Sequence, residues 1–396
     1  LGLVGLLAGG VGGVLSAGTV EQALRGSVER DELPLELQDR FNRAVERINR
    51  EDFEGALADV EQICAAYPRC ASAWLYRGRI KRSQGEHAAA LADVQKALEV
   101  QPEFFEAHND EGVLLHELKR FDEALRAFDI ACRELPAYAN HWRNRAGTRF
   151  ELKDYELALA DLERAKQADP RYADAYYLHG LILKRTQGPK AALPLFDKAI
   201  ELEPNKADAL NSRGLVKSEL GDHQGSRDDY SAAIYGLLEN KVVYHHNRGC
   251  AREELGDYAG ALSDFGEAVA IDDEHARSYY RRGFVFLRLG DLVSGAQDFR
   301  KALELTPEDD ADYEQIAKNA NQLTRALERQ VYEVMPSGAN LFDRPDTNAR
   351  VLLQLPAKTR VHLLRSQPPF AEVELGYKGR TIRGYMLQMR MSLALD

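Results

Sequence analysis

The residues in this sequence that come nearest to a reactive group are His245, His246 and Cys250. On a helix, His246 and Cys250 would lie four residues apart on one face, where an imidazole and a thiolate can share a metal ion. Two such ligands are fewer than a closed zinc site requires. We therefore predict that this group holds no metal.

Other candidates for chemistry favour structural roles. Cys64 and Cys70 would pair only in an exported chain and would otherwise be free thiols. We find no nucleophile elbow, phosphate-binding loop, metalloprotease helix or kinase signature in the sequence. The acidic runs Glu253-Glu254 and Glu308-Asp309-Asp310 are typical of solvated surfaces. We expect no enzyme activity, no catalytic residue and no cofactor.

The composition bounds the class of protein. A length of 396 residues indicates several domains or one elongated architecture. Hydrophobic residues at 44% and charged residues at 29% exclude a disordered, collagen-like or multi-span membrane chain. The net charge of −11 argues against nucleic acid as a partner, because phosphate binding needs a dominant basic surface.

The first twenty residues, Leu1 to Val20, are uncharged and rich in Leu, Val and Gly. They predict either a membrane-spanning anchor or the apolar part of a cleaved signal peptide, and both alternatives stay open. Only Arg25 and Arg30 are basic in the flank that follows, which favours export of the rest. We expect residues 21–36 to form a linker or lead-in helix.

Internal repeats dominate the middle of the chain. A small residue recurs at intervals of 34 or 35 residues, namely Ala44, Gly78, Gly112, Ala146, Gly180, Gly214, Gly249 and Gly283. A second series of mostly larger apolar residues follows sixteen positions later: Val60, Val94, Phe128, Leu162, Phe196, Tyr230, Phe265 and Phe299. This period predicts helical hairpins stacked into a solenoid, in which the larger residue on the second helix fills the space left by the small one.

The pattern resembles the tetratricopeptide repeat. His108, Glu111, Gly112, Ala124, Phe128 and Pro136 follow that family's motif, and Trp74 and Trp142 stand where the family places Trp. The resemblance implies a mainly α fold, with a right-handed α-solenoid of about eight hairpins over residues 37–309. A polar segment with apolar positions Ile316, Ala320, Leu323 and Leu327 predicts a capping helix over 310–330.

The repeats also reveal an internal covariation. Six of them pair an Arg with an Asp sixteen residues later: Arg43 with Asp59, Arg77 with Asp93, Arg145 with Asp161, Arg213 with Asp229, Arg248 with Asp264, and Arg282 with Asp298. The other two repeats lack both residues and have Glu111 with Ala127 and His179 with Leu195. We infer a bidentate guanidinium–carboxylate bridge between the two helices of each such hairpin.

The tail, residues 331–396, changes to short β-rich runs separated by Pro, Gly and Asn, which predicts a small barrel. Ala339-Asn340-Leu341, Arg344-Pro345 and Gly384-Tyr385-Met386 resemble the bacterial SH3-like (SH3b) domain. Ala357 departs from the glycine usual in that family. The tail carries nine basic and six acidic residues, a net charge of +3 that suits peptidoglycan or another anionic polymer.

In the tetratricopeptide family, the first helix of each hairpin lines a concave surface that binds peptides or partner helices. The positions expected to face it here are Tyr76, Arg79, Arg82, Asn109, Asp110, Arg143, Asn144, Tyr177, Arg185, Asn247, Arg277 and Arg281. Aromatic rings beside charged and amide groups suit an extended peptide. Arg277, Arg281 and Arg288 make the last repeat basic, as an acidic segment would require.

These patterns predict a non-enzymatic scaffold that binds protein or peptide partners at the bacterial envelope. We expect a periplasmic or membrane-anchored location, with the cytoplasm as the alternative, and contact with the membrane unless residues 1–20 are cleaved. Two other functions remain open. In one, the tail is a wall-polymer binding module; in the other, the chain is the regulatory end of a membrane enzyme, such as a kinase, whose catalytic domain precedes Leu1.

Overall fold

The computed structural model describes residues 34–235, 242–329, 331–334, 339–342, 351–356, 359–367, 370–377, 380–387 and 391–393. The predicted signal or anchor and nearly all of the lead-in segment lie outside these residues. None of the described helices is both long and apolar enough to cross a membrane. The chain divides after Pro204 into two compact units.

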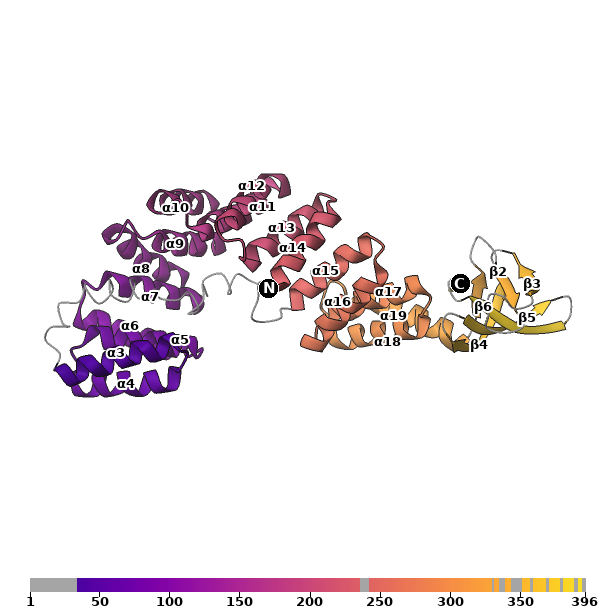
Figure 1. Cartoon of the computed structure of the whole chain (residues 1–396), viewed down its shortest axis with the longest axis horizontal. Helices are drawn as coiled ribbons and strands as arrows, with labels where there is room; N and C mark the ends of the chain where they lie inside the picture. The colour runs from indigo at the N-terminus through magenta and orange to yellow at the C-terminus, as the bar shows by residue number, and fades with distance from the viewer. Residues whose placement is uncertain are drawn as a thin grey trace. The chain divides into compact units, whose positions relative to one another are not determined.

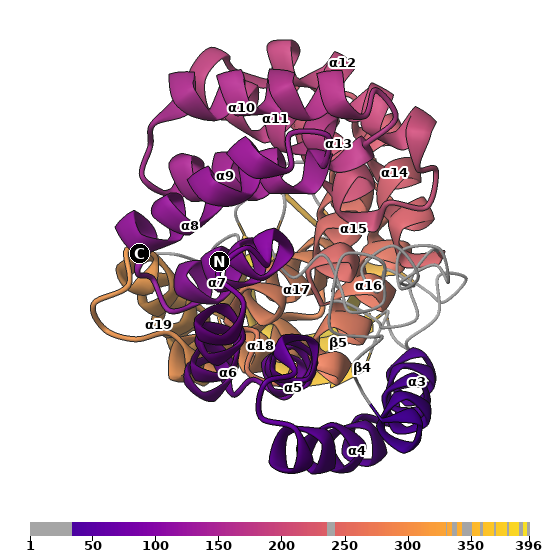
Figure 2. The ribbon, with the colours of Figure 1, turned by 90° about the vertical axis from the view of Figure 1, so that its left-hand side faces the viewer.

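Unit 1 contains five helical hairpins, each made of two consecutive helices (Figure 1). Its helices are α3 (Leu35–Asn49), α4 (Phe53–Ala66), α5 (Ala71–Ser83), α6 (His87–Val100), α7 (Phe105–Glu117), α8 (Phe121–Glu134), α9 (Ala139–Glu151), α10 (Tyr155–Ala168), α11 (Ala173–Gln187) and α12 (Pro189–Leu202). The second helix of each hairpin also contacts the first helix of the next within the unit, so that α9, α10 and α11 lie side by side (Figure 2).

Unit 2 contains three further hairpins, a single helix and a β-sheet. The helices are α13 (Ala207–Glu219), α14 (His223–Tyr235), α15 (Val242–Glu254), α16 (Tyr258–Ile271), α17 (Ala276–Leu289), α18 (Leu292–Leu305) and α19 (Tyr313–Arg329). The described residues thus form a mainly helical structure with a solenoid-like arrangement of hairpins, which confirms that part of the prediction. The one-residue insertion expected around 238–242 falls largely outside the described residues.

The interior of each hairpin follows the predicted complementarity of small and large residues. A Cβ atom added to Gly249 would lie 2.8 Å from Phe265 Cε1, and one added to Gly112 would lie 2.6 Å from Phe128 Cε1. Where Ala146 replaces glycine, the facing residue is the smaller Leu162. Both members of these pairs are buried, because the helices approach closely only when one of them lacks bulk.

The turn inside each hairpin needs one residue with positive φ. Gly85, Gly221, Gly256 and Gly290 supply it in four hairpins, with φ between 77° and 84°. Glu51, Lys119 and Lys153 adopt the same conformation with φ of 63°, 60° and 65°, which is unfavourable for residues that carry a Cβ. In several hairpins an Asp follows this residue and caps the second helix, as when Asp257 accepts a hydrogen bond of 3.0 Å from the Gly260 amide.

Helix α19 lies in the segment where the capping helix was predicted. Ile316, Ala320 and Leu323 are buried, and the last two belong to one core cluster with Ala296 and Phe299 of α18. Asn319 also donates a hydrogen bond of 2.9 Å to the Tyr280 hydroxyl of α17. The helix thereby buries the apolar surface that the last hairpin would otherwise expose.

The tail forms an antiparallel sheet with strand order β3-β2-β6-β5-β4-β1-β7 among the described strands. The strands are β1 (Val331–Val334), β2 (Ala339–Phe342), β3 (Val351–Leu355), β4 (Arg360–Gln367), β5 (Phe370–Tyr377), β6 (Arg380–Leu387) and β7 (Met391–Leu393). β5 and β6 pair in register from Phe370↔Leu387 to Tyr377↔Arg380, and β4 shifts register between Leu363 and Arg365. Val361, Val373, Leu375 and Met386 are buried. Closure of this sheet into an SH3-like barrel stays a prediction.

Candidate functional site

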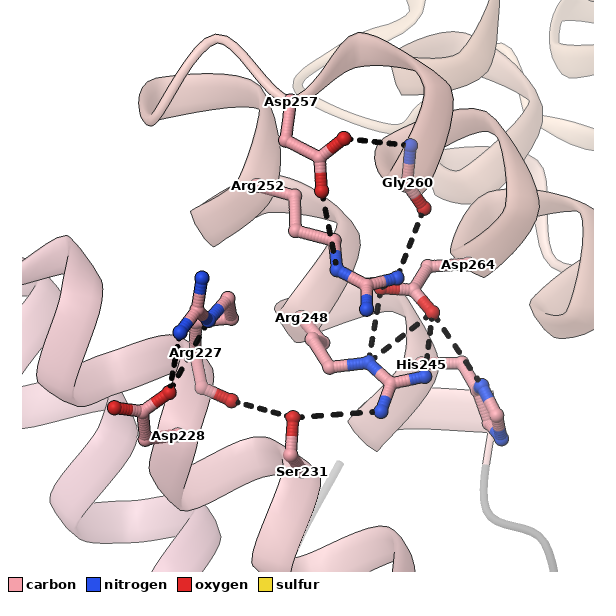
Figure 3. Close-up of polar contacts among 9 residues, drawn as sticks. All are labelled: Arg227, Asp228, Ser231, His245, Arg248, Arg252, Asp257, Gly260 and Asp264. Atoms are coloured by element: carbon pink, nitrogen blue, oxygen red, sulfur yellow. Dashed lines mark hydrogen bonds and ion pairs between the residues drawn. The ribbon is translucent and has the colours of Figure 1, made fainter.

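In six of the eight described hairpins, charged residues gather around one buried carboxylate. In the seventh repeat Asp264 on α16 is 1% exposed and accepts hydrogen bonds from Arg248 Nη2 at 2.7 Å and Arg248 Nε at 3.0 Å (Figure 3). Arg252 Nη1 lies 2.9 Å from the same carboxylate and 3.1 Å from the Gly260 carbonyl oxygen. A single aspartate therefore joins two cations of α15 to helix α16.

All six predicted Arg–Asp bridges are present. In every one the Arg Nη2 donates to Asp Oδ1 at 2.5 to 2.8 Å, and Arg Nε donates as well. The six aspartates are at most 6% exposed. Burial acts to raise the pKa of the Asp264 carboxyl, but His245, whose Nδ1 lies 3.9 Å from Oδ1, the hydrogen bonds from Arg248 and the charge of Arg252 together hold it below its usual value.

A second cation completes five of these clusters, and sequence reasoning missed it. One helical turn after the bridging arginine stand Arg47, Lys81, Arg149, Lys217 and Arg252, each 2.7 to 2.9 Å from the shared aspartate. The two repeats without the Arg–Asp pair have Leu115 and Leu183 at this position. That covariation was readable in the sequence and identifies the cluster as a three-residue unit.

Tryptophan side chains link consecutive repeats by hydrogen bonds. Trp74 Nε1 donates to the Pro68 carbonyl at 2.8 Å, and Trp142 Nε1 donates to the Pro136 carbonyl at 2.9 Å. The guanidinium of Arg145 lies 4.9 Å from the centre of the Trp142 ring. The bridging arginine is thus fixed by a ring on one side and by its aspartate on the other.

We call the predicted binding surface the A-helix face, meaning repeat positions two, five, six, nine, twelve and thirteen on the first helix of each hairpin. In unit 1 it is held together by ion pairs between the second and third repeats. Arg79 Nε donates to Asp110 Oδ2 at 2.5 Å, and Arg82 Nη2 lies 2.6 Å from Glu117 Oε1. These predicted site residues therefore have partners inside the fold.

The amide residues of this face form a second link between repeats. Asn144 Nδ2 donates to Asn109 Oδ1 at 3.1 Å, and Arg143 Nη1 donates to Asn144 Oδ1 at 3.1 Å. All three side chains are buried, with exposures of 4% to 8%. Their contact with a partner stays a prediction.

The two predicted tyrosines are also buried. Tyr76 is 4% exposed and meets the Phe41 ring edge-on at 5.2 Å, and Tyr177 is 7% exposed and lies 5.9 Å from the Phe196 ring. Arg185 differs, because it is exposed on α11 and donates from Nε to the Tyr155 hydroxyl at 2.7 Å. The structure does not join it to the other predicted residues by any contact among the described side chains.

In unit 2 the A-helix face repeats the amide link and adds exposed cations. Asn247 Nδ2 donates to Asn211 Oδ1 at 2.9 Å, the counterpart of the pair in unit 1. Arg277 and Arg281 of α17 are both exposed. The only ion pair of Arg281 with a described residue is to Glu253, at 3.5 Å.

His246 lies beside Cys250 as predicted, with Nε2 3.7 Å from Sγ, and its other ring nitrogen has a further partner. His246 Nδ1 lies 2.9 Å from Ser278 Oγ, and His275 Nδ1 lies 2.8 Å from the same oxygen. Burial lowers the pKa of His246 to about 3 and raises the pKa of the Cys250 thiol to about 11. No group of three or more potential ligands is placed to hold a metal ion within the described residues. Cys64 and Cys70 are both buried free thiols.

A shallow pocket of about 440 Å³ lies apart from the A-helix face, lined by Pro136, Ala137, Trp142, Arg164, Gln167 and Ala168. Its lining comes from α9, from α10 and from the connection between α8 and α9. None of the predicted site residues contributes to it.

Comparisons with known proteins agree with the arrangement of these hairpins. The tetratricopeptide repeat matches residues 41–99, 79–139, 120–173, 177–237 and 246–310, which together are more than half of the chain. A search among curated proteins finds no match.

Two solved structures resemble the fold. A chain of the APC/C hetero-tetramer Cut9-Hcn1 is 16% identical with a TM-score of 0.54, and the match covers 68% of this chain and 52% of that one. Yeast Tom70 is 15% identical with a TM-score of 0.52, and the match covers 74% and 65%. This chain therefore spans about half the length of the first relative and about two thirds of the second.

Proposed function

Because the chain belongs to the tetratricopeptide repeat family, whose members generally mediate protein–protein interactions, we propose that it is a non-enzymatic scaffold that binds protein or peptide partners through its A-helix faces. The fold is typically a non-catalytic interaction scaffold. One observation carries the proposal: the buried charges around each aspartate are satisfied inside the hairpin, while Arg185, Arg277 and Arg281 project from the A-helix face. Such a rigid frame loses little conformational entropy when a partner binds.

Site-specific photo-crosslinking on the full chain tests this proposal. A benzophenone amino acid replaces Arg185 or Arg281 on the A-helix face, and Arg126 on the second helix α8 serves as the control because its side chain is 70% exposed. We expect the same protein to be captured from the first two positions and not from the third. Equal capture from all three positions, or capture from the control alone, contradicts the proposal.

The tail is a second candidate, favoured by its net charge of +3 within a chain of net charge −11. We propose that an SH3-like tail contacts an anionic wall polymer. Sedimentation of the full chain with purified peptidoglycan tests this, with a variant in which Arg383 and Arg380 are changed to Gln as the comparison. A chain that stays in the supernatant at low salt contradicts it.

We also propose a location at the bacterial envelope, with an N-terminal segment that meets the membrane. The uncharged stretch Leu1 to Val20 supports it. Cell fractionation of the chain with and without residues 1–20 is the test. Equal recovery of both forms in the cytoplasmic fraction contradicts the proposal.

A further inference from the structure

Three arginines of α17 form one line on the A-helix face of the last hairpin. Arg277, Arg281 and Arg288 are spaced by four and seven residues, and all three are exposed. At 100° per residue these positions fall within about 40° of one another around the helix. Phe284 lies on the same line and is half-buried against Tyr280 and Phe299. We call these four residues the arginine stripe.

The arginines of the stripe have fewer carboxylate partners than the arginines on the A-helix face of unit 1. Arg79 and Arg82 each face a carboxylate of the next repeat at 2.5 to 2.6 Å. Within the described residues, Arg277 and Arg288 make no ion pair, and Arg281 reaches only Glu253 at 3.5 Å.

Glu253 does not neutralise the stripe. It is one carboxylate beside three guanidinium groups, and its side chain is 13% exposed. Burial raises the pKa of Glu253, although the charges of Arg281 and Arg288 oppose that change. At least two positive charges therefore remain for a ligand, on a chain whose net charge is −11.

The neighbouring groups favour a peptide over a polyanion. Phe284 offers an apolar contact between Arg281 and Arg288, which a phosphate polymer cannot use. Asn247 of α15 adds an amide on the same face, suited to a peptide backbone. Three arginines also release few counterions, which gives weak binding to nucleic acid on a strongly acidic protein.

We propose that the arginine stripe binds an extended acidic peptide segment, a proposal that rests on the scaffold function above and names its ligand class. A helix rises about 1.5 Å per residue, so Arg281, Phe284 and Arg288 stand about 6, 10.5 and 16.5 Å along α17 from Arg277. An extended peptide advances about 3.3 Å per residue and its side chains alternate between two faces, so the residues that face the stripe at j+2, j+4 and j+6 lie about 6.6, 13.2 and 19.8 Å from the first. The segment therefore carries carboxylates at positions j, j+2 and j+6 and an apolar residue at j+4, with offsets of up to about 3 Å that long arginine side chains span.

Fluorescence anisotropy with a labelled synthetic peptide on the full chain tests the proposal. The probe is a twelve-residue peptide with Asp at j, j+2 and j+6 and Leu at j+4, and the control peptide has the same composition with its three Asp residues consecutive. The protein variants are Arg277→Gln, Arg281→Gln, Arg288→Gln and their triple combination, with Arg126→Gln as a matched exposed control. Circular dichroism shows that each variant is folded.

We expect each single variant to weaken binding of the probe by about two- to fivefold and the triple variant by at least about tenfold, as for exposed ion pairs. Arg126→Gln leaves the affinity unchanged, and the control peptide binds more weakly than the probe. Unchanged affinity of the triple variant overturns the proposal. Tighter binding of a single-stranded oligonucleotide to the same three arginines overturns it as well. If the crosslinked partner above is still captured by the triple variant, the scaffold function stands and this ligand assignment fails.

Discussion

In the six hairpins that have an Arg–Asp bridge, the buried aspartate allows a quantitative test of how much the bridge stabilises the fold. Asp161 accepts hydrogen bonds from Arg145 Nε at 3.0 Å, Arg145 Nη2 at 2.6 Å and Arg149 Nη1 at 2.7 Å. The arginine side chains are 13% and 17% exposed, and that of Asp161 is 3% exposed. Asp161→Ala would leave Arg149 without its carboxylate and Arg145 with only the exposed Asp129, whose Oδ1 lies 2.5 Å from Arg145 Nη1.

The magnitude follows from that geometry. Removal of one partner of a buried ion pair costs about 3 to 5 kcal/mol, and the residual exposure of the two arginines places Asp161→Ala near about 3 kcal/mol. A double-mutant cycle of Arg145→Ala with Asp161→Ala should give a coupling free energy of about 2 kcal/mol. The exposed pair Lys96 and Glu99, at 2.7 Å on α6, is the control and should couple by less than about 0.5 kcal/mol.

Another repeat of the chain shows which uncharged residues can replace the cluster of Arg145, Arg149 and Asp161. The fifth repeat has His179, Leu183 and Leu195 at the three equivalent positions. The triple variant Arg145→His, Arg149→Leu, Asp161→Leu should therefore stay within about 1 kcal/mol of the wild-type free energy of unfolding, because no buried charge is left unpaired. It should be far more stable than Asp161→Ala alone.

Urea unfolding followed by far-ultraviolet circular dichroism and by tryptophan fluorescence measures these free energies. Both tryptophans, Trp74 and Trp142, lie in unit 1 and report on it directly. Coincident transitions by the two probes would justify a two-state treatment. A coupling below about 0.5 kcal/mol between Arg145 and Asp161, equal to that of the exposed control pair, would refute the reasoning.

Three further perturbations test other parts of the fold. Lys153→Gly should raise the free energy of unfolding by about 0.5 to 1 kcal/mol, because Lys153 has a φ of 65°; a loss of stability in urea melts would contradict this. Gly249→Ala should lower the free energy of unfolding by about 1 to 3 kcal/mol, because the added methyl group crowds Phe265. Adding Phe265→Leu should recover part of this loss, as the natural pair of Ala146 with Leu162 suggests. Equal stability of the single variant and the wild type would rule the contact out. Because burial lowers the pKa of His246 to about 3, the unfolded chain binds a proton that the folded chain does not between about pH 6.5 and 3. Stability should therefore fall as the pH drops through that window, by up to about 1.4 kcal/mol per pH unit for this histidine, and His246→Gln should flatten the slope by about one proton.

The helices were predictable because the same packing pattern recurs in every repeat. Glycine faces a large ring in five repeats and Val94 in one, and alanine faces a smaller aliphatic residue in the other two, so the partner of each position could be identified eight times in one chain. The Arg–Asp bridges were predictable for the same reason, since two repeats that lack both members served as internal controls. The second cation accompanies five of the six Arg–Asp pairs, and it becomes visible only when three repeat positions are compared together.

The candidate site was harder to predict, because exposure on the A-helix face is set by the neighbouring repeat. Arg143 and Arg277 lie at positions five and two of the A-helix face, yet Arg143 is 4% exposed and buried, whereas Arg277 is exposed. Residue type alone cannot distinguish them. The difference in exposure arises from contacts between residues about one repeat apart, such as Asn109 with Asn144. No local pattern in the sequence predicts these contacts.

A comparison of equivalent positions explains why the last hairpin differs. In the second and third repeats, position nine carries Arg79 and position six of the next helix carries Asp110, so the pair neutralises itself at 2.5 Å. In the seventh and eighth repeats the same two positions hold Cys250 and Arg281. Burial raises the pKa of the Cys250 thiol to about 11, so Cys250 supplies no negative charge near neutral pH and Arg281 has only the 3.5 Å contact with Glu253 among the described carboxylates. The repeats thus use one geometry in two ways: a facing carboxylate makes the A-helix face a structural joint, and under our proposal its absence leaves the same face available for binding.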